Sequence, residues 1–167
     1  MMVHVIRRIA VVICLLLTFV GCERVVTPKE LAHEAVEMEL DLVYSLYSHQ
    51  EALKADSVVR GLLHYSMSKA DSISLSRCYV SVLLALDSGK SALKHVEFGF
   101  PEDGADDYEL MRRHSFRFQA FMADEECDSA WAELARGFQL VERNDKLQLK
   151  RADLELNKGV LEQRCPR

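Results

Sequence analysis

The stretch LSRCYVSVLLAL, Leu75–Leu86, indicates the fold class of this chain of 167 residues. Its apolar residues at positions 75, 78, 82 and 86 lie three or four apart, which is the spacing of one helix face. Further apolar residues at 80, 83 and 84 widen that face. A helix so broadly apolar is expected at the centre of a fold, with other helices packed against it. We therefore expect this helix, whose pattern continues to Val96, to be the central element of an all-α domain.

Apolar residues follow the same helical period before this stretch. A first helix is predicted to begin after Thr27, because Thr27-Pro28-Lys29-Glu30 has the N-cap Thr, the Pro and the Glu of a capping box. The pattern of this helix continues to Leu63. Its predicted buried face consists of Leu31, Ala35, Met38, Leu42, Leu46 and Leu53.

Three polar segments separate the predicted helices. They are the Ser-rich run Ser66–Ser72, the Gly- and Pro-containing loop Phe98–Asp107, and the short turn Asn144-Asp145. The chain has only seven Gly and three Pro, strand-like alternation is scarce, and no internal repeat is evident. The predicted fold is a small antiparallel helical bundle of four to five helices, formed by residues 28–167.

The first residues have the organisation of an export signal. A short basic segment with Arg7 and Arg8 precedes twelve apolar or neutral residues, Ile9–Val20. A membrane-spanning helix needs about 20 such residues, so this run is too short to cross a bilayer. A basic start followed by a short apolar core is typical of a signal peptide. We therefore predict that residues 1–21 are removed on export.

The end of this leader carries a family resemblance. Thr18-Phe19-Val20-Gly21-Cys22 resembles the lipobox of bacterial lipoprotein precursors, in which apolar residues and a small residue precede a cysteine. Phe19 departs from the Leu that such boxes usually carry. The resemblance implies that Cys22 receives a diacylglycerol, becomes the first residue after cleavage, and anchors the protein in the bacterial envelope, facing the periplasm. The alternative is plain secretion, with Cys22 free or in a disulfide.

A lipid on Cys22 would hold the helical domain at the membrane surface. Residues 22–27 are the predicted tether, and the four residues between Cys22 and Thr27 reach less than about 20 Å when fully extended. Without residues 1–21 the chain keeps 19 basic and 26 acidic residues, a net charge of −7. Nucleic acids and anionic lipid head groups attract basic surfaces, so this charge argues against both as main partners.

The cysteines predict one disulfide. Three remain once the leader and the anchor are set aside: Cys78, Cys127 and Cys165. An exported protein meets an oxidising compartment, where one bonded pair and one free thiol are expected. Folding the chain about Asn144-Asp145 places Cys127 opposite Cys165 and aligns apolar residues along both helices, so we expect this bond. Folding about the loop 98–107 places Cys78 opposite Cys127 instead, and three buried thiols are a further alternative.

One set of side chains suits a metal ion. Glu30, His33 and Glu37 lie at i, i+3 and i+7 of the first predicted helix and would share one face. An imidazole with carboxylates can bind a divalent metal. A di-iron bundle needs a second Glu-x-x-His pair, which is absent here. The alternative is a solvated charged face, and no cofactor is predicted.

The same helix carries a ridge of like charges. Its members are Glu30, Glu34, Glu37 and Asp41. Neighbouring like charges on a helix cost a few tenths of a kcal/mol each, so basic groups are expected close by. The residues that we expect to pair with them are Arg143, Lys146 and Lys150, near the turn at Asn144-Asp145. A basic surface on another protein is the alternative.

No motif predicts an enzyme. Ser66-Met67-Ser68-Lys69 matches the S-x-x-K pattern of penicillin-recognising enzymes, but the companion motifs are absent and the chain is too short for that fold.

An anchored, acidic helical domain is instead predicted to be a protein-interaction module: an assembly, accessory, exclusion or immunity-type lipoprotein with an envelope protein as its partner. The alternative is a periplasmic helical bundle that binds a metal ion or a small ligand.

Overall fold

The computed structural model describes residues 30–166. The leader, Cys22, the tether and the predicted capping box up to Lys29 lie outside these residues. The described part of the chain is all-α, as predicted. It contains seven α-helices and one 3₁₀ helix: α2 (His33–Ser48), α3 (Ala52–Leu62), α4 (Lys69–Ala85), α5 (Gly89–Gly99), α6 (Asp107–Ala123), α7 (Cys127–Arg143), η1 (Asp145–Lys150) and α8 (Arg151–Arg164).

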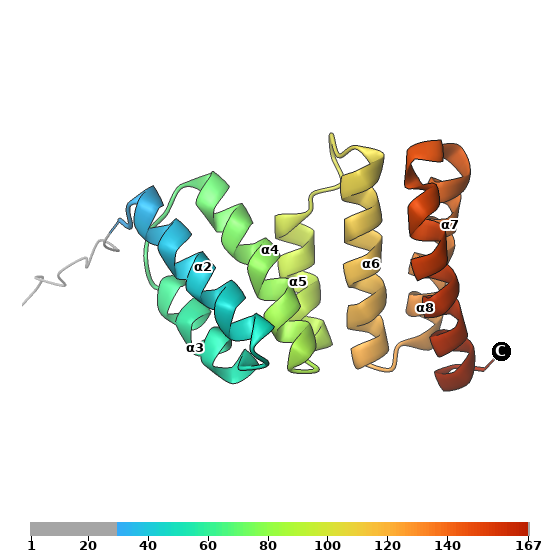
Figure 1. The fold of residues 1–167 in the computed structure, drawn as a ribbon, viewed down its shortest axis with the longest axis horizontal. Helices are drawn as coiled ribbons and strands as arrows, with labels where there is room; N and C mark the ends of the chain where they lie inside the picture. The colour runs from blue at the N-terminus through green and yellow to red at the C-terminus, as the bar shows by residue number, and fades with distance from the viewer. Residues whose placement is uncertain (1–29, 167) are drawn as a thin grey trace, which may run out of the picture.

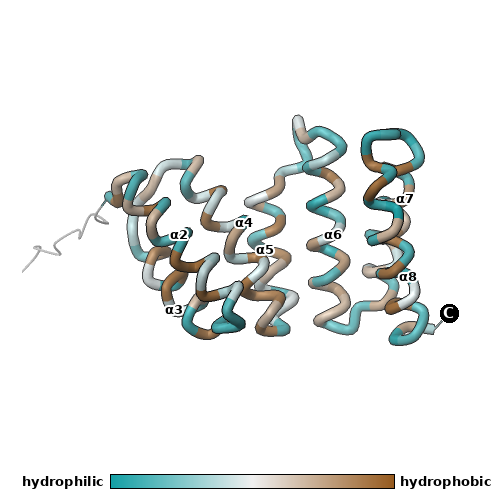
Figure 2. The backbone as a smooth tube through the Cα atoms, in the orientation of Figure 1, coloured by the Kyte–Doolittle hydropathy of each residue, from teal (hydrophilic) through white to brown (hydrophobic). Residues whose placement is uncertain are grey.

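The helices form an elongated bundle in which they stand side by side in one row. Figure 1 shows this row, from α2 and α3 at one end to α7 and α8 at the other. Consecutive helices pack on each other, and α2 also contacts α4, as α4 contacts α6. Hydrophobic and hydrophilic residues alternate along the helices (Figure 2), as expected where each helix has one buried face. The buried core is divided into clusters: one at the α6–α8 end, one mainly among α2 to α5, and a small one of Val80, Val96 and Phe100.

The helices recur at a nearly constant spacing, which makes the row a structural repeat. α2, α4 and α6 begin 36 and 38 residues apart, and α3, α5 and α7 begin 37 and 38 residues apart. η1 begins at Asp145, again 38 residues after the start of α6. The described chain is thus three helical hairpins followed by the first half of a fourth, with a period typical of helical repeat proteins. No internal repeat is evident in the amino-acid sequence, so the repeat is recognised only from the positions of the helices.

Each hairpin turns at a residue with left-handed backbone. These residues are Gln50, Asp87 and Glu125, with φ of 62°, 49° and 58°. In every case the next N–H bonds at 2.9 Å to a carbonyl five residues earlier: Glu51 to Leu46, Ser88 to Leu83, and Glu126 to Phe121. This is a Schellman motif, which usually has glycine at the left-handed position. The prediction of four to five helices is wrong because these turns, which have no glycine at the left-handed position, divide three predicted helices into six.

Equivalent positions of the hairpins hold equivalent side chains. The fifth residue after each turn is alanine and the ninth is aliphatic, and all six are at most 3 % exposed: Ala55, Ala92, Ala130, Val59, Val96 and Leu134. The small alanine lets the second helix of each hairpin approach its neighbours closely. At Gly89 the approach is closer still, since a Cβ atom there would lie 2.2 Å from the carbonyl oxygen of Ala120.

The first helix differs from its prediction in both start and orientation. α2 begins at His33, and its buried side chains are Val36 and Val43. On the face predicted to be buried, Met38 is 73 % exposed and Leu42 45 % exposed. Among the described helices, α2 stands at the end of the row and packs on α3 and α4. Because α2 has two apolar stripes and neighbours on one side, only one stripe is buried.

Candidate functional site

The uncovered stripe of α2 is bordered by acids. We define the outer face of α2 as Ala35, Met38 and Leu42 together with Glu34, Glu37 and Asp41. All of these side chains are exposed except the partly buried Ala35. α2 carries four carboxylates and neither Lys nor Arg. The structure therefore brings together an exposed apolar stripe and a negative potential on one helix surface.

The basic ridge predicted to pair with these acids lies elsewhere. Arg143 is ion-paired with Asp107 of α6, and the Lys150 Nζ atom lies 3.4 Å from an oxygen of Asp153. Both basic residues are at the α7–α8 end of the row, opposite α2 (Figure 1). The predicted internal pairing is therefore wrong. Within residues 30–166, Glu34 and Asp41 form no ion pair.

The predicted metal ligands do not share one helical face. Glu30 precedes α2, and the backbone beside it is held to the Ser66 region, where the Leu31 N–H donates to the Ser66 carbonyl at 2.9 Å. His33 and Glu37 form an ion pair, with 3.3 Å between His33 Nε2 and the Glu37 carboxylate. Among the described residues, no group of three or more His, Cys, Asp or Glu side chains is arranged to hold a metal ion.

His33 instead joins the first two hairpins. Its Nδ1 lies 2.6 Å from Oδ1 of Asp71, whose other oxygen accepts from the Ser68 hydroxyl at 2.7 Å. Ser68 is also the N-cap of α4, since its hydroxyl oxygen accepts from the Asp71 N–H. Hydrogen bonding and the charge of Asp71 raise the pKa of His33 above 6.5, and Glu37 adds to this. Donation by Ser68 and then by His33 lowers the pKa of Asp71 below 3.8.

The pKa of His33 should depend mainly on Asp71. We expect Asp71→Asn to return the imidazole pKa towards 6.5, and Glu37→Gln, the matched control, to lower it less, because Asp71 is the larger cause. The proton-linked contribution of His33 to stability is complete below pH 6.5 and is lost as the pH rises through the raised pKa. Titration of the His33 ring by NMR measures both effects, and equal shifts in the two variants would contradict the assignment.

A buried carboxylate ties α6 to α7. The Glu133 side chain is 2 % exposed and accepts from His114 Nδ1 at 2.7 Å and from Arg117 Nε at 2.9 Å. Arg136 adds a third ion pair from the next turn of α7. Burial raises the pKa of Glu133, but donation by His114 and Arg117 outweighs it, so that the pKa lies below 4.5. This cluster holds helices together, and no sequence motif points to it.

The ion-pair cluster extends to α5. Glu97 of α5 is ion-paired with both Arg117 and Arg113 of α6. Arg113, 8 % exposed at its side chain, also donates to the carbonyl of Phe100. Because Glu133 and Glu97 share Arg117, the carboxylates and guanidinium groups form one network across three helices. Such a network is best explained as a structural element of the row.

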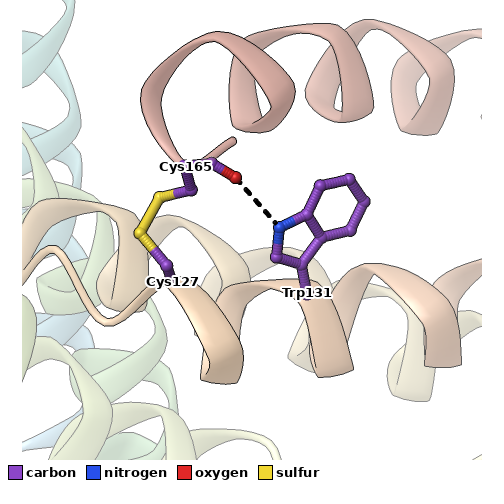
Figure 3. The surroundings of a disulfide bond; sticks show 3 residues. All are labelled: Cys127, Trp131 and Cys165. Carbon is purple, nitrogen blue, oxygen red and sulfur yellow. Dashed lines mark hydrogen bonds between the residues drawn. A yellow bond between two sulfur atoms is a disulfide. The ribbon is translucent and has the colours of Figure 1, made fainter. Parts of the chain in front are cut away.

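The last helix is held by the predicted disulfide. Cys127, at the start of α7, is bonded to Cys165, just beyond α8, with 5.6 Å between their Cα atoms. Figure 3 shows the Trp131 indole beside the bond, where Nε1 donates to the Cys165 carbonyl at 3.4 Å. Cys78 is a buried free thiol in α4, which excludes the alternative Cys78–Cys127 pair. Burial raises the Cys78 pKa to about 11, so this thiol is unreactive.

Two surface grooves adjoin α8. One, of about 540 Å³, lies between α7 and α8, with Trp131, Leu134 and Phe138 among its lining residues. The other, of about 430 Å³, lies between α6 and α8 and is lined in part by Tyr108 and Phe116. They border the first half of the incomplete fourth hairpin. Sequence reasoning missed these grooves because they depend on how far apart the helices stand.

No family model, curated protein or solved structure matches this chain. In residues 30–166, no helix is both long and apolar enough to cross a membrane.

Proposed function

We propose that this protein is a lipid-anchored lipoprotein of the bacterial envelope that acts as a protein-interaction module. The observation that carries this proposal is the outer face of α2. Met38 and Leu42 are large apolar side chains that are 73 % and 45 % exposed at the end of the helical row. Repeat proteins normally end in a helix with a polar outer surface, because exposed apolar surface favours association.

The energetics support binding to a protein rather than to a lipid surface. Burying apolar surface gains about 25 cal/mol per Å², so covering Met38 and Leu42 would contribute to affinity. The acids beside them would be repelled by anionic head groups and attracted by basic side chains. The best partner is therefore a protein surface with an apolar strip bordered by Lys or Arg. Such a surface accounts for both the exposed stripe and the acids of α2.

The leader supplies the anchor in this proposal. It resembles a lipobox only in its last residues, and Cys22 is the residue that would carry the lipid. From Cys22 to the start of α2 at His33 an extended chain reaches at most about 40 Å. The outer face of α2 would therefore stay close to the membrane surface, where envelope proteins are concentrated.

Site-specific crosslinking tests the proposed function. A photoreactive residue at Met38 should give discrete protein adducts in intact envelopes, and adding Leu42→Glu should reduce them about tenfold by placing a charge in the contact. The same probe at Phe98, which is 49 % exposed on α5, is the matched control and should give none of these adducts. Cys22→Ser should remove fatty-acid labelling and the adducts together. Identical adducts at both positions, or none at Met38, would contradict the proposal.

A further inference from the structure

The outer face of α2 has a counterpart at the other end of the row. η1 and α8 expose Leu149, Leu156 and Val160 by 90 %, 70 % and 41 %. These residues follow helical spacing and lie opposite the buried stripe of Leu147, Leu154 and Leu161. α8 packs on α7 and η1, and Leu156 also lines the groove between α8 and α6. Both terminal helices of the row therefore carry a second, exposed apolar stripe.

The charges near Leu149 and those beside the α2 stripe are opposite in sign. Residues 143–151 contain four basic side chains and one acid, and we call the basic ones the basic corner: Arg143, Lys146, Lys150 and Arg151. Lys146, Lys150 and Arg151 are near Leu149 in the chain, and Leu149 is the most exposed large apolar side chain of the described residues. On α2, the acids border Met38 and Leu42 in the same way. The acids of α2 and the basic corner stand at opposite ends of the row (Figure 1).

We propose that the occupant of both ends is a second copy of this chain. The outer face of α2 in one copy would pack on the exposed stripe of α8 in the next, with its acids against the basic corner. The row itself provides the template, because first helices already pack on first helices where α2 contacts α4 and α4 contacts α6. An α2 packed on α8 would make the same kind of contact between first helices that the described chain makes from α2 to α6.

The contact is head-to-tail rather than symmetric. Two outer faces of α2 would place the three acids of one copy against the same three acids of the other, and two basic corners would repel in the same way. A heterologous contact either closes into a ring or continues as a linear assembly. This inference shares the α2 face with the proposed function, but it needs no other protein, so purified protein tests it separately.

Charge reversal gives the decisive experiment. The full chain, purified in detergent, is compared by sedimentation velocity with Glu34→Lys/Asp41→Lys and with Lys146→Glu/Arg151→Glu. The wild type should associate, more strongly at low salt, and each variant should bind itself at least about tenfold more weakly. An equimolar mixture of the two variants should recover association, because each reversed end then meets an opposite charge. Wild type that stays monomeric at about 100 μM, or a mixture that recovers nothing, would overturn the proposal.

Cysteine pairing fixes the geometry of the contact. Met38→Cys and Leu156→Cys proteins should form a mixed disulfide-linked dimer under mild oxidation, whereas each alone should form none. Cys78 is buried and Cys127 is bonded to Cys165, so these native thiols do not compete. Dimers of either variant alone would overturn the head-to-tail arrangement. Loss of this self-contact with persistent Met38 adducts to other envelope proteins would leave the proposed function standing and remove only the self-association.

Discussion

Glu133→Ala should destabilise the protein by about 3 kcal/mol. Removing one partner of a buried ion pair typically costs about 3–5 kcal/mol, because the remaining charges lose their counterion. The lower end applies here, since Arg117 and Arg136 are 22 % and 52 % exposed and water can solvate them in part. His114, 12 % exposed, loses its hydrogen-bond acceptor as well. The loss should appear in urea-induced unfolding followed by circular dichroism.

Two controls distinguish the loss of the Glu133 ion pairs from the loss of any acid on the same helix: substitution of an exposed glutamate, and the pH dependence of stability. Glu142→Ala, at an exposed position of the same helix, should change stability by no more than about 0.5 kcal/mol. Because the pKa of Glu133 is lowered, its contribution is present above pH 4.5 and disappears as the pH falls through the folded-state pKa. The difference between wild type and Glu133→Ala should therefore shrink below pH 4.5. Equal costs for the two variants would refute a special role for Glu133.

Breaking the disulfide should have an effect of similar size. The bond joins residues 38 positions apart, for which chain entropy predicts a stabilisation of about 3–4 kcal/mol. Cys127→Ser and Cys165→Ser should each lower the melting temperature, and the double variant should fall little further, because either change alone removes the bond.

Reduction provides the control for the disulfide. Wild type in reductant should unfold at nearly the same temperature as the Cys127→Ser variant, and reductant should leave that variant unchanged. Cys78→Ser should cost only core packing, and it should retain its response to reductant because its Cys127–Cys165 bond is intact. A wild type that does not respond to reductant would contradict a stabilising bond.

The disulfide could be predicted because its determinants are local in sequence. A short turn at Asn144-Asp145 joins two helices, and counting outward from it pairs Cys127 with Cys165. The loop 98–107 and the Ser-rich run were predictable for a similar reason, since glycine, proline and serine mark chain reversals. Ser68, the observed N-cap of α4, lies within that run.

Two of the hairpin turns could not be predicted because their residues are ordinary in helices, and the third, Asp87-Ser88-Gly89, has turn residues but lies within an apolar pattern that continues to Val96. Gln50 and Glu125 continue an apparently helical pattern, and only the left-handed φ of the folded chain reveals the reversal. Without those turns the repeat is invisible, and the end of the row cannot be located. The predicted burial of Met38 failed for this reason: periodicity finds an apolar stripe, but the number of neighbours decides whether that stripe is covered.

The Glu133 network escaped prediction for a different reason. Its members come from three helices, and each looks like a surface residue in its own segment. Glu133 has no partner within a turn apart from Arg136, and both His114 and Arg117 reach it from α6. A buried charge is recognised only when the packing of those helices is known.

Contacts between neighbouring hairpins also determine how the molecule would respond to a pulling force. If the two ends of the row were pulled apart, the same force would act on every interface between neighbouring hairpins. The weakest interface would then open first, while the others stayed intact. The α7–α8 end is closed by a covalent bond. At the opposite end, α2 is held by the buried Val36 and Val43 and by the His33–Asp71 contact. We therefore expect the hairpins to unfold one after another from α2 onward under a pulling force. Each unfolded hairpin would lengthen the chain by about 120 Å.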